Sequence, residues 1–337
     1  MKVKNLWFLS IVVVIVFLIN FVAYSADEQV WELKLGSKMY ENNPESQGVK
    51  KFIELAEERS GGRLKIIPYW GQALGDDKTQ IENVMTGLQD FYIETYTYYA
   101  PYVPEFSVHT LGFFFNGNEE YQKFLLSPIE KEMEDKLIEK IGVRILNSKR
   151  NWVRGPFRTI MSRKPITSLE DLQGIKLRLT SAPISIKLWS ALGTNTVIVP
   201  WTEVYLALQQ GMVDAVTCTI NGMNTEKFYE IIKNVTITNE YPQQLAVIMN
   251  ERKFQALPED LQKILIDAID EGGEVCTELV VGGANNIIEN LKKEYGVTFY
   301  EIDLTPWLEK AKEVNKALEA SGDVPVGLLD RITDLLR

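Results

Sequence analysis

Apolar and polar residues alternate along this chain with two periods, one typical of strands and one typical of helices. Trp31–Gly36 follows the two-residue period of a strand, Gln47–Ser60 gathers its apolar residues on one helical face, and Leu64–Tyr69 is expected to form the next strand. A further helix ends at Gly87, and Phe91–Ile93 is expected to form another short strand. Strand–helix–strand units of this length predict an α/β fold with largely parallel sheets.

The same alternation is densest between Arg158 and Cys218. Strands are expected at Arg158–Ser162, Ile175–Leu179, Val197–Val199 and Val213–Cys218. Helices are expected between them: one from Ser168 with Asp171 in a capping-box position, one at Ile184–Leu192, and one at Glu203–Gln210 with Thr202 as its N-cap. Because ligands bind beyond the carboxyl ends of parallel strands, this stretch predicts a binding site at one sheet edge.

Three residues with binding chemistry fall at that edge: Arg178 near the end of one strand, Trp201 just beyond another and Cys218 at the end of a third. Arginine binds a carboxylate bidentately and a broad aromatic face covers a carbon skeleton, so the pair predicts a site for a small organic anion. Arg158 and Arg178 are expected on neighbouring strands, where guanidinium groups without counterions call for an anion. The alternatives are a surface salt bridge for either arginine and a core position for Trp201.

The rest of the chain adds helices and an aromatic cluster. Tyr121–Lys140 has a helical pattern. A long helical section runs from Pro258 to about Tyr295, with Gly272-Gly273 and Gly282-Gly283 as breaks or close-packing points. Four tyrosines are expected either to line the rim of a cleft or to pack beneath a long connection: Tyr96, Tyr98, Tyr99 and Tyr102.

Composition and the N-terminus indicate an exported protein. The chain has 337 residues, enough for two domains, and its formal net charge of -10 argues against nucleic acid as a partner. Two lysines precede an apolar run at Leu6–Val22, and the small residues of Ala23–Ser25 predict a signal peptide over residues 1–25. An uncleaved membrane anchor is the alternative, because the run approaches spanning length. Either segment places the body of the protein outside the cytoplasm.

Residues for catalysis or metal binding are scarce. The single histidine, His109, lies among apolar and aromatic residues, which favours a structural role and excludes most histidine-based metal sites. The sequence contains no nucleophile elbow, phosphate loop or dinucleotide-binding glycine motif. Cys218 and Cys276 could form a disulfide, but two separate buried thiols are the preferred interpretation. The sequence therefore predicts a binding protein with no cofactor and no metal, rather than an enzyme.

Two motifs make the chain recognisable. One is R-x(7)-I-T-S-L-E-D-L-Q-G-I-K-L-R from Arg158 to Arg178, and the other is E-V-Y-L-A-L-Q-Q-G-M-V-D from Glu203 to Asp214. Shorter matching pieces lie at residues 60–66, 71–77 and 257–263. With these motifs the chain resembles the solute-binding proteins of tripartite ATP-independent periplasmic (TRAP) transporters, of the dicarboxylate- and sialic-acid-binding type. The resemblance covers nearly the whole mature chain.

The resemblance implies a fold and a role. The fold is the two-lobe α/β fold of periplasmic binding proteins, with a hinge and a long helix spanning both lobes. Lobe I is expected to comprise residues 26–155 plus about 244–283, and lobe II residues 156–243 plus about 284–337. The role is periplasmic capture of a small carboxylate in the cleft between the lobes and its delivery to the TRAP membrane permease subunits.

The resemblance also implies roles for individual residues. Arg178 is expected to pair bidentately with the ligand carboxylate, Arg158 to support it, and Trp201 to lie against the ligand. Four positions are expected to belong to the cleft wall of lobe I: Lys38, Asp77, Glu94 and Thr95.

The chain departs from the family pattern after Val213. Many relatives read V-D-G-Q-E-N there, and this chain reads V-D-A-V-T-C, so that Cys218 replaces an asparagine that helps to hold the ligand. Asn221 and Asn224 are candidates to supply the missing polar group. Neither sialic acid nor a simple dicarboxylate follows from the sequence, and Trp201 suggests a flatter or more apolar ligand. A receptor that feeds a sensor or an ATP-driven importer, and a secreted enzyme on the same architecture, are the alternative functions.

Overall fold

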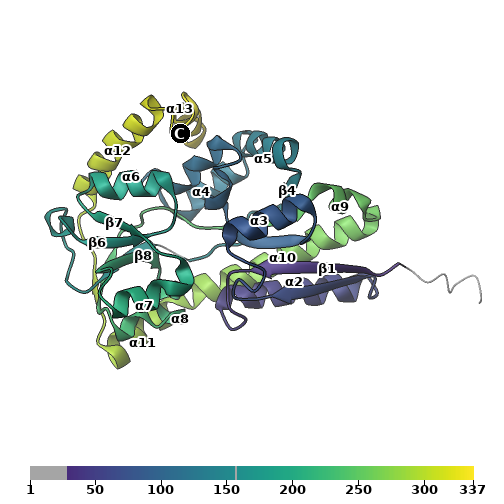
Figure 1. The fold of residues 1–337 in the computed structure, drawn as a ribbon, viewed down its shortest axis with the longest axis horizontal. Coiled ribbons are helices and arrows are strands. Elements are labelled where there is room, and N and C mark those ends of the chain that lie inside the picture. The colour runs from purple at the N-terminus through teal and green to yellow at the C-terminus, as the bar shows by residue number, and fades with distance from the viewer. Residues whose placement is uncertain (1–28, 156–157) are drawn as a thin grey trace, which may run out of the picture.

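The computed structural model describes residues 29–155 and 158–337, and the predicted signal segment 1–25 lies outside the described residues. Two β-sheets flanked by helices organise this part of the chain (Figure 1). The first sheet contains, in spatial order, β2 (Leu64–Tyr69), β1 (Trp31–Ser37), β3 (Phe91–Thr95), β10 (Leu245–Asn250) and β4 (Val143–Ile145). The second contains β11 (Thr298–Tyr300), β9 (Asn234–Ile237), β5 (Arg158–Ser162), β8 (Ala215–Thr219), β6 (Lys176–Leu179) and β7 (Asn195–Ile198).

Helices connect and cover these strands. The α-helices are α2 (Pro44–Arg59), α3 (Asp77–Thr86), α4 (Gly117–Leu125), α5 (Pro128–Ile141), α6 (Pro183–Ala191), α7 (Val204–Gln209), α8 (Ile220–Thr225), α9 (Glu251–Ala256), α10 (Glu259–Gly282), α11 (Ala284–Tyr295), α12 (Thr305–Ala320) and α13 (Leu328–Leu336). The 3-10 helices are η1 (Tyr96–Tyr99), η2 (Pro104–Thr110), η3 (Glu170–Leu172), η4 (Trp201–Glu203) and η5 (Phe228–Glu230). The α/β class predicted from the hydrophobic pattern is confirmed.

Both sheets are mixed rather than purely parallel. In the second sheet β6 runs parallel to β7 and β8, as predicted, but β5 runs antiparallel to both β8 and β9. In the first sheet β10 runs antiparallel to β3 and β4, and in sequence it lies between β9 and β11 of the second sheet. The chain therefore passes from one sheet to the other more than once. The lobe boundaries proposed from sequence stay a prediction.

Helix α10 joins the two halves of the molecule. It packs along α2, where a Cβ on Gly48 would lie 2.5 Å from the Gly272 carbonyl oxygen, so the glycines permit this approach. Near its other end, the Val280 carbonyl accepts a hydrogen bond of 3.2 Å from Asn221 on α8. Gly272 therefore marks close packing inside a continuous helix, whereas the helical axis is interrupted at Gly283, between α10 and α11.

Several local predictions were wrong or incomplete. The predicted helix Tyr121–Lys140 divides into α4 and α5, because Pro128 begins a new helix that the Ser127 side chain caps. Thr202 caps no helix, since it lies inside η4. The helix expected from Ser168 shortens to the turn η3, although the Asp171 carboxylate accepts the Ser168 backbone N–H at 3.0 Å as a capping box requires. Strand β9 and helix α13 were not predicted.

Candidate functional site

The polar residues of the predicted site meet at one edge of the second sheet because of strand direction. Parallel strands β6 and β8 both end there, which places Arg178 and Cys218 at the same edge. Strand β5 runs the opposite way and begins there, with Arg158 paired to Thr219 in register. The two arginines therefore share an edge, but the expectation of neighbouring strands is wrong, since β8 lies between β5 and β6.

A small cavity of about 70 Å³ opens at this edge, between the second sheet and residues from the first half of the chain. Seven of the nine predicted ligand-binding residues line it: Lys38, Glu94, Thr95, Arg158, Arg178, Trp201 and Cys218. The other two do not. Asp77 lines a neighbouring groove instead and accepts a 3.0 Å hydrogen bond from Lys38, and Asn221 turns its side chain toward α10.

Arg178 is a buried cation without a counterion. Its side chain is only 2% exposed, and its Nε and Nη2 both donate to the Val199 carbonyl, at 2.8 and 2.6 Å. The guanidinium carbon lies 5.3 Å from the centre of the Trp201 ring. Within residues 29–155 and 158–337, no carboxylate forms an ion pair with it. Burial disfavours the charged form and lowers the pKa of Arg178 to about 10, so the guanidinium is still charged at neutral pH.

Arg158 is equally buried but has its own partners. Its Nε donates to Glu240 at 3.1 Å, and its two terminal nitrogens donate to Gln243 and Thr217, each at 2.7 Å. The guanidinium also lies over the ring of Tyr241, 4.4 Å from its centre. The expectation of two arginines without counterions is therefore wrong, and only Arg178 fits it.

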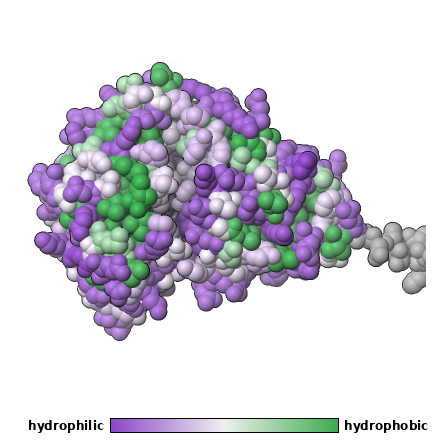
Figure 2. Space-filling model, viewed as in Figure 1, coloured by the Kyte–Doolittle hydropathy of each residue, from purple (hydrophilic) through white to green (hydrophobic). Residues whose placement is uncertain are grey.

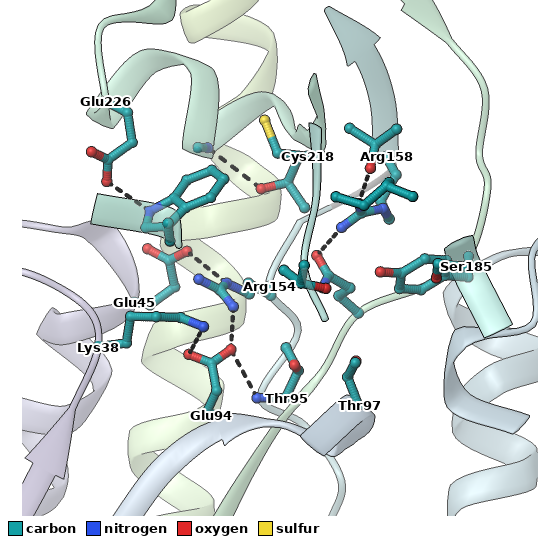
Figure 3. A pocket seen from close by; sticks show the side chains of 18 of the residues that line it. Lys38, Glu45, Glu94, Thr95, Thr97, Arg154, Arg158, Ser185, Cys218 and Glu226 are labelled. Carbon is teal, nitrogen blue, oxygen red and sulfur yellow. Dashed lines mark hydrogen bonds and ion pairs between the residues drawn. The ribbon is translucent and has the colours of Figure 1, made fainter. Parts of the chain in front are cut away.

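Opposite these arginines lies a network of buried charges (Figure 3). Arg154 donates to Glu94 at 2.5 Å, and Lys38 lies 3.4 Å from the other oxygen of Glu94. Lys38 also donates to Asp77 at 3.0 Å and to the Tyr98 hydroxyl at 2.8 Å. Burial opposes ionisation of Glu94, but Arg154 and Lys38 outweigh it and hold the pKa of Glu94 below its ordinary value.

Two further carboxylates on this side lack such partners. Glu45 is 4% exposed; one of its oxygens lies 3.9 Å from Nε of Arg154, and the other accepts no hydrogen bond from any described residue. Glu226 accepts a hydrogen bond of 3.0 Å from the indole N–H of Trp201. Burial raises the pKa of both glutamates, because neither has enough donors to offset the loss of water.

Trp201 and Cys218 form the apolar part of the cavity. The Trp201 ring packs edge-on against Phe228, with 5.5 Å between ring centres. The Cys218 thiol donates to the Met161 sulfur at 3.5 Å, and burial raises the pKa of Cys218 to about 12. Cys276 is a second buried free thiol, so the interpretation of two separate thiols is confirmed. Cys218 is therefore an uncharged, unreactive contact surface and no nucleophile.

A wider groove of about 400 Å³ adjoins the cavity and shares Tyr98, Arg178 and Trp201 with it. Its walls are largely apolar and come from α3, η1, the start of α6 and the segment after β7. In the space-filling view, a hollow separates the part that carries β6 to β8 from the part that carries α3 (Figure 2). The groove gives a ligand a route to the guanidinium of Arg178.

Sequence reasoning missed several cavity residues. Glu45 stands in the first turn of α2, where an acidic residue is ordinary, and Glu226 follows the short helix α8 in a polar stretch. Arg154 lies in a segment with little regular structure, and its role depends on Glu94, distant in sequence. For Tyr98 the sequence did contain a signal, because the rim of a cleft was one of the two interpretations of the tyrosine cluster.

The structure offers no ready metal site in the part of the chain that it describes, where no three metal-ligating side chains gather. His109 is buried, bonded through Nδ1 to the Tyr121 hydroxyl at 2.8 Å and 3.3 Å from Glu130, as a structural histidine would be. Among the described helices, none combines the length and the apolar composition needed to cross a membrane.

Known proteins resemble the chain over both sheets. Residues 35–321 match the family described as bacterial extracellular solute-binding protein, family 7 (DctP). The 2,3-diketo-L-gulonate-binding periplasmic protein YiaO of Escherichia coli (strain K12) is 27% identical over 261 residues, 77% of this chain and 78% of that protein. The sialic acid-binding periplasmic protein SiaP of Vibrio cholerae is 25% identical over 294 residues, 87% of this chain and 90% of that protein.

A solved structure gives the same result for the fold. The sugar acid binding protein DctPAm of Advenella mimigardefordensis strain DPN7T, in complex with galactonate, matches with a TM-score of 0.83 at 25% identity. The match covers 92% of this chain and 99% of that one. The periplasmic-binding-protein fold predicted from the sequence is confirmed.

Proposed function

The chain belongs to family 7 of the bacterial extracellular solute-binding proteins, and from this membership we propose that it captures a small organic acid in the cavity beside Arg178. The observation that carries the proposal is the state of Arg178, which is buried and charged and has no carboxylate partner among the described residues. A ligand carboxylate would supply the missing counterion and accept the guanidinium hydrogens that Val199 leaves free. The relatives that bind sugar acids and sialic acid support the same ligand class.

The other cavity residues have supporting roles in this proposal. Arg158, held by Glu240, adds positive potential without needing the ligand as a counterion. Trp201 covers one face of the ligand, and Cys218 contributes a small apolar surface. Capture draws the two halves of the molecule together about the segments that cross between them. A decrease in radius of gyration on ligand addition, measured by X-ray scattering, tests this closure.

Mass spectrometry of the ligand released from purified, denatured protein tests the ligand class. We expect an organic acid in amounts close to one per chain. Calorimetry with that acid should show no binding at matched concentrations for Arg178→Ala and full binding for Arg163→Ala, a control at an exposed arginine that donates to the Leu208 carbonyl. Release of a neutral or cationic ligand would contradict the proposal.

Delivery of the acid to a TRAP permease is the second half of the proposed function. It rests on the family and on the periplasmic relatives. Uptake into vesicles that contain the two membrane subunits should require this protein and an ion gradient, and should proceed without ATP. Uptake that requires ATP would favour the importer alternative instead. Purified protein should also bind the acid without converting it, because the family consists of binding proteins rather than enzymes.

Export through residues 1–25 completes the proposal. The protein recovered from the periplasm should have the mass of a chain that begins at Ala26. An intact N-terminus in the membrane fraction would instead identify the segment as an anchor.

A further inference from the structure

Charges are unevenly distributed along the cavity. At one end lie the guanidinium groups of Arg158 and Arg178 with a single carboxylate, Glu240, which pairs with Arg158 alone. At the other end, acids outnumber cations: Glu45, Glu94, Glu226 and Asp77 surround Lys38 and Arg154. Figure 3 shows Glu45 and Glu226 on the same side of the cavity, away from Arg158 and Ser185. A ligand that lies along the cavity therefore meets a cationic end and an acidic end.

The two cations at the acidic end are already engaged. Lys38 donates hydrogen bonds to Asp77 and to the Tyr98 hydroxyl, and its ammonium group also lies within ion-pair distance of Glu94, at 3.4 Å. Arg154 donates to Glu94 and faces Glu45 at 3.9 Å. Neither cation is left without a counterion, so this end offers no equivalent of Arg178.

The acids at this end, in contrast, have unused acceptor capacity. Glu45 is nine-tenths buried, lines the cavity and has one oxygen that accepts no hydrogen bond from the residues that the structure describes. Glu226 lines the same wall and accepts from Trp201 through one oxygen only. A ligand group that donates hydrogen bonds would satisfy these oxygens, because buried carboxylate oxygens otherwise lose their water without replacement.

We propose that the ligand carries a single carboxylate, which meets Arg178, and a hydroxyl or ammonium group at its other end, which donates to Glu45 and Glu226. This deepens the proposed function and rests on it. A second carboxylate in the same position would stand beside two acids and meet no cation that lacks a counterion, so dicarboxylates of the same length are rejected. The raised pKa of Glu45 and of Glu226 supports this polarity, since burial already opposes negative charge on this wall.

Matched acids that differ only at the far end test the proposal. Calorimetry on the purified protein would compare galactonate with galactarate, and 4-hydroxybutyrate and 4-aminobutyrate with succinate. The monocarboxylate of a set should bind at least tenfold more tightly than its dicarboxylate. Equal affinities, or tighter binding of galactarate or succinate, would overturn the inference and leave the proposed function standing.

Two isosteric variants locate the effect. In Glu45→Gln combined with Glu226→Gln, the preference against the dicarboxylate should shrink at least tenfold. Glu230→Gln is the control, because that carboxylate is exposed and accepts from Tyr205 much as Glu226 accepts from Trp201. Loss of 4-aminobutyrate binding with retention of 4-hydroxybutyrate in the double variant would identify ammonium as the donor; the opposite pattern would identify hydroxyl.

If none of these acids binds, the chemical groups of the ligand released from purified protein test the inference. One carboxyl group together with a hydroxyl or amino group supports the inference, and two carboxyl groups overturn it. A protein that releases no acid and binds none contradicts the proposed function itself.

Discussion

Removal of the Arg178 side chain separates ligand binding from folding. If the ligand binds as proposed, its carboxylate loses a bidentate, charge-assisted partner in Arg178→Ala, at a buried position of the cavity wall. Loss of one partner from such a buried pair costs about 2–5 kcal/mol. Since each 1.4 kcal/mol corresponds to about tenfold in Kd, the affinity should fall at least about thirtyfold.

Stability should respond differently. Burial lowers the pKa of Arg178 to about 10, which corresponds to roughly 3 kcal/mol against the charged form in the unliganded protein. Arg178→Met removes that penalty but leaves the Val199 carbonyl without its two donors, a loss of about 1–3 kcal/mol. The two effects oppose each other, so the free energy of unfolding should change by less than about 2 kcal/mol.

Arg158→Met is the matched comparison. It leaves Glu240, which is 0% exposed, without its ion-pair partner, and should destabilise the protein by about 3–5 kcal/mol. Urea unfolding of the unliganded variants gives the stabilities, and calorimetry with the released acid gives the affinities. An affinity loss below tenfold for Arg178→Ala, or a stability loss for Arg178→Met as large as that for Arg158→Met, would refute the role assigned to Arg178.

Three further predictions concern the acidic end, a helix contact and the thiols. Burial raises the pKa of Glu45, so at pH values just above the ordinary pKa of 4.5 the folded protein binds more protons than the unfolded chain. The stability of the unliganded protein therefore falls as the pH rises from 4.5 toward the pKa of Glu45 in the folded protein. Glu45→Gln should reduce this fall, measured as the midpoint of urea unfolding at each pH. Identical pH slopes for the two proteins would contradict this. Gly272→Ala should destabilise by about 1–3 kcal/mol, because its Cβ would lie 2.6 Å from a backbone oxygen of α2, whereas Gly282→Ala, which faces open space, should be neutral or stabilise by about 0.5 kcal/mol. Equal losses of stability would rule out the close contact. Cys218 and Cys276 should resist a thiol reagent in the native protein and react fully after unfolding, since both are buried and free; rapid native labelling would argue against their burial.

The sequence predicted best where one local rule decides the outcome. Strand period and helix-stop signals placed β6 and β8, and the rule for the carboxyl ends of parallel strands then brought Arg178 and Cys218 together. The antiparallel course of β5 was not predictable in this way, because it depends on long connections rather than on the pattern of the strand itself. For this reason the sequence placed Arg158 at the correct sheet edge, but wrongly predicted that its strand lies directly beside the strand of Arg178.

The charge pairs that the sequence did not predict join residues that lie far apart along the chain. Arg154 is defined as a site residue by Glu94, 60 positions away, and Arg158 is neutralised by Glu240, 82 positions away. No local pattern reports such a pair. Glu45 is a similar case, since an acid in the first turn of a helix is ordinary until the cavity shows that one of its oxygens has no donor.

In the function proposed for this molecule, ligand recognition depends on the buried charges that have no partner within the protein. Arg158 and Arg178 are both buried at one sheet edge, yet Glu240 neutralises only the first. On the opposite wall, Lys38 and Arg154 are engaged by Glu94, while Glu45 keeps an unused oxygen. The guanidinium of Arg178 and the unused oxygens of Glu45 and Glu226 thus remain available to a ligand in a cavity of about 70 Å³. Because an unmatched buried charge is destabilising, each end selects the ligand group that neutralises or satisfies it, and a second acid at the wrong end carries a penalty instead.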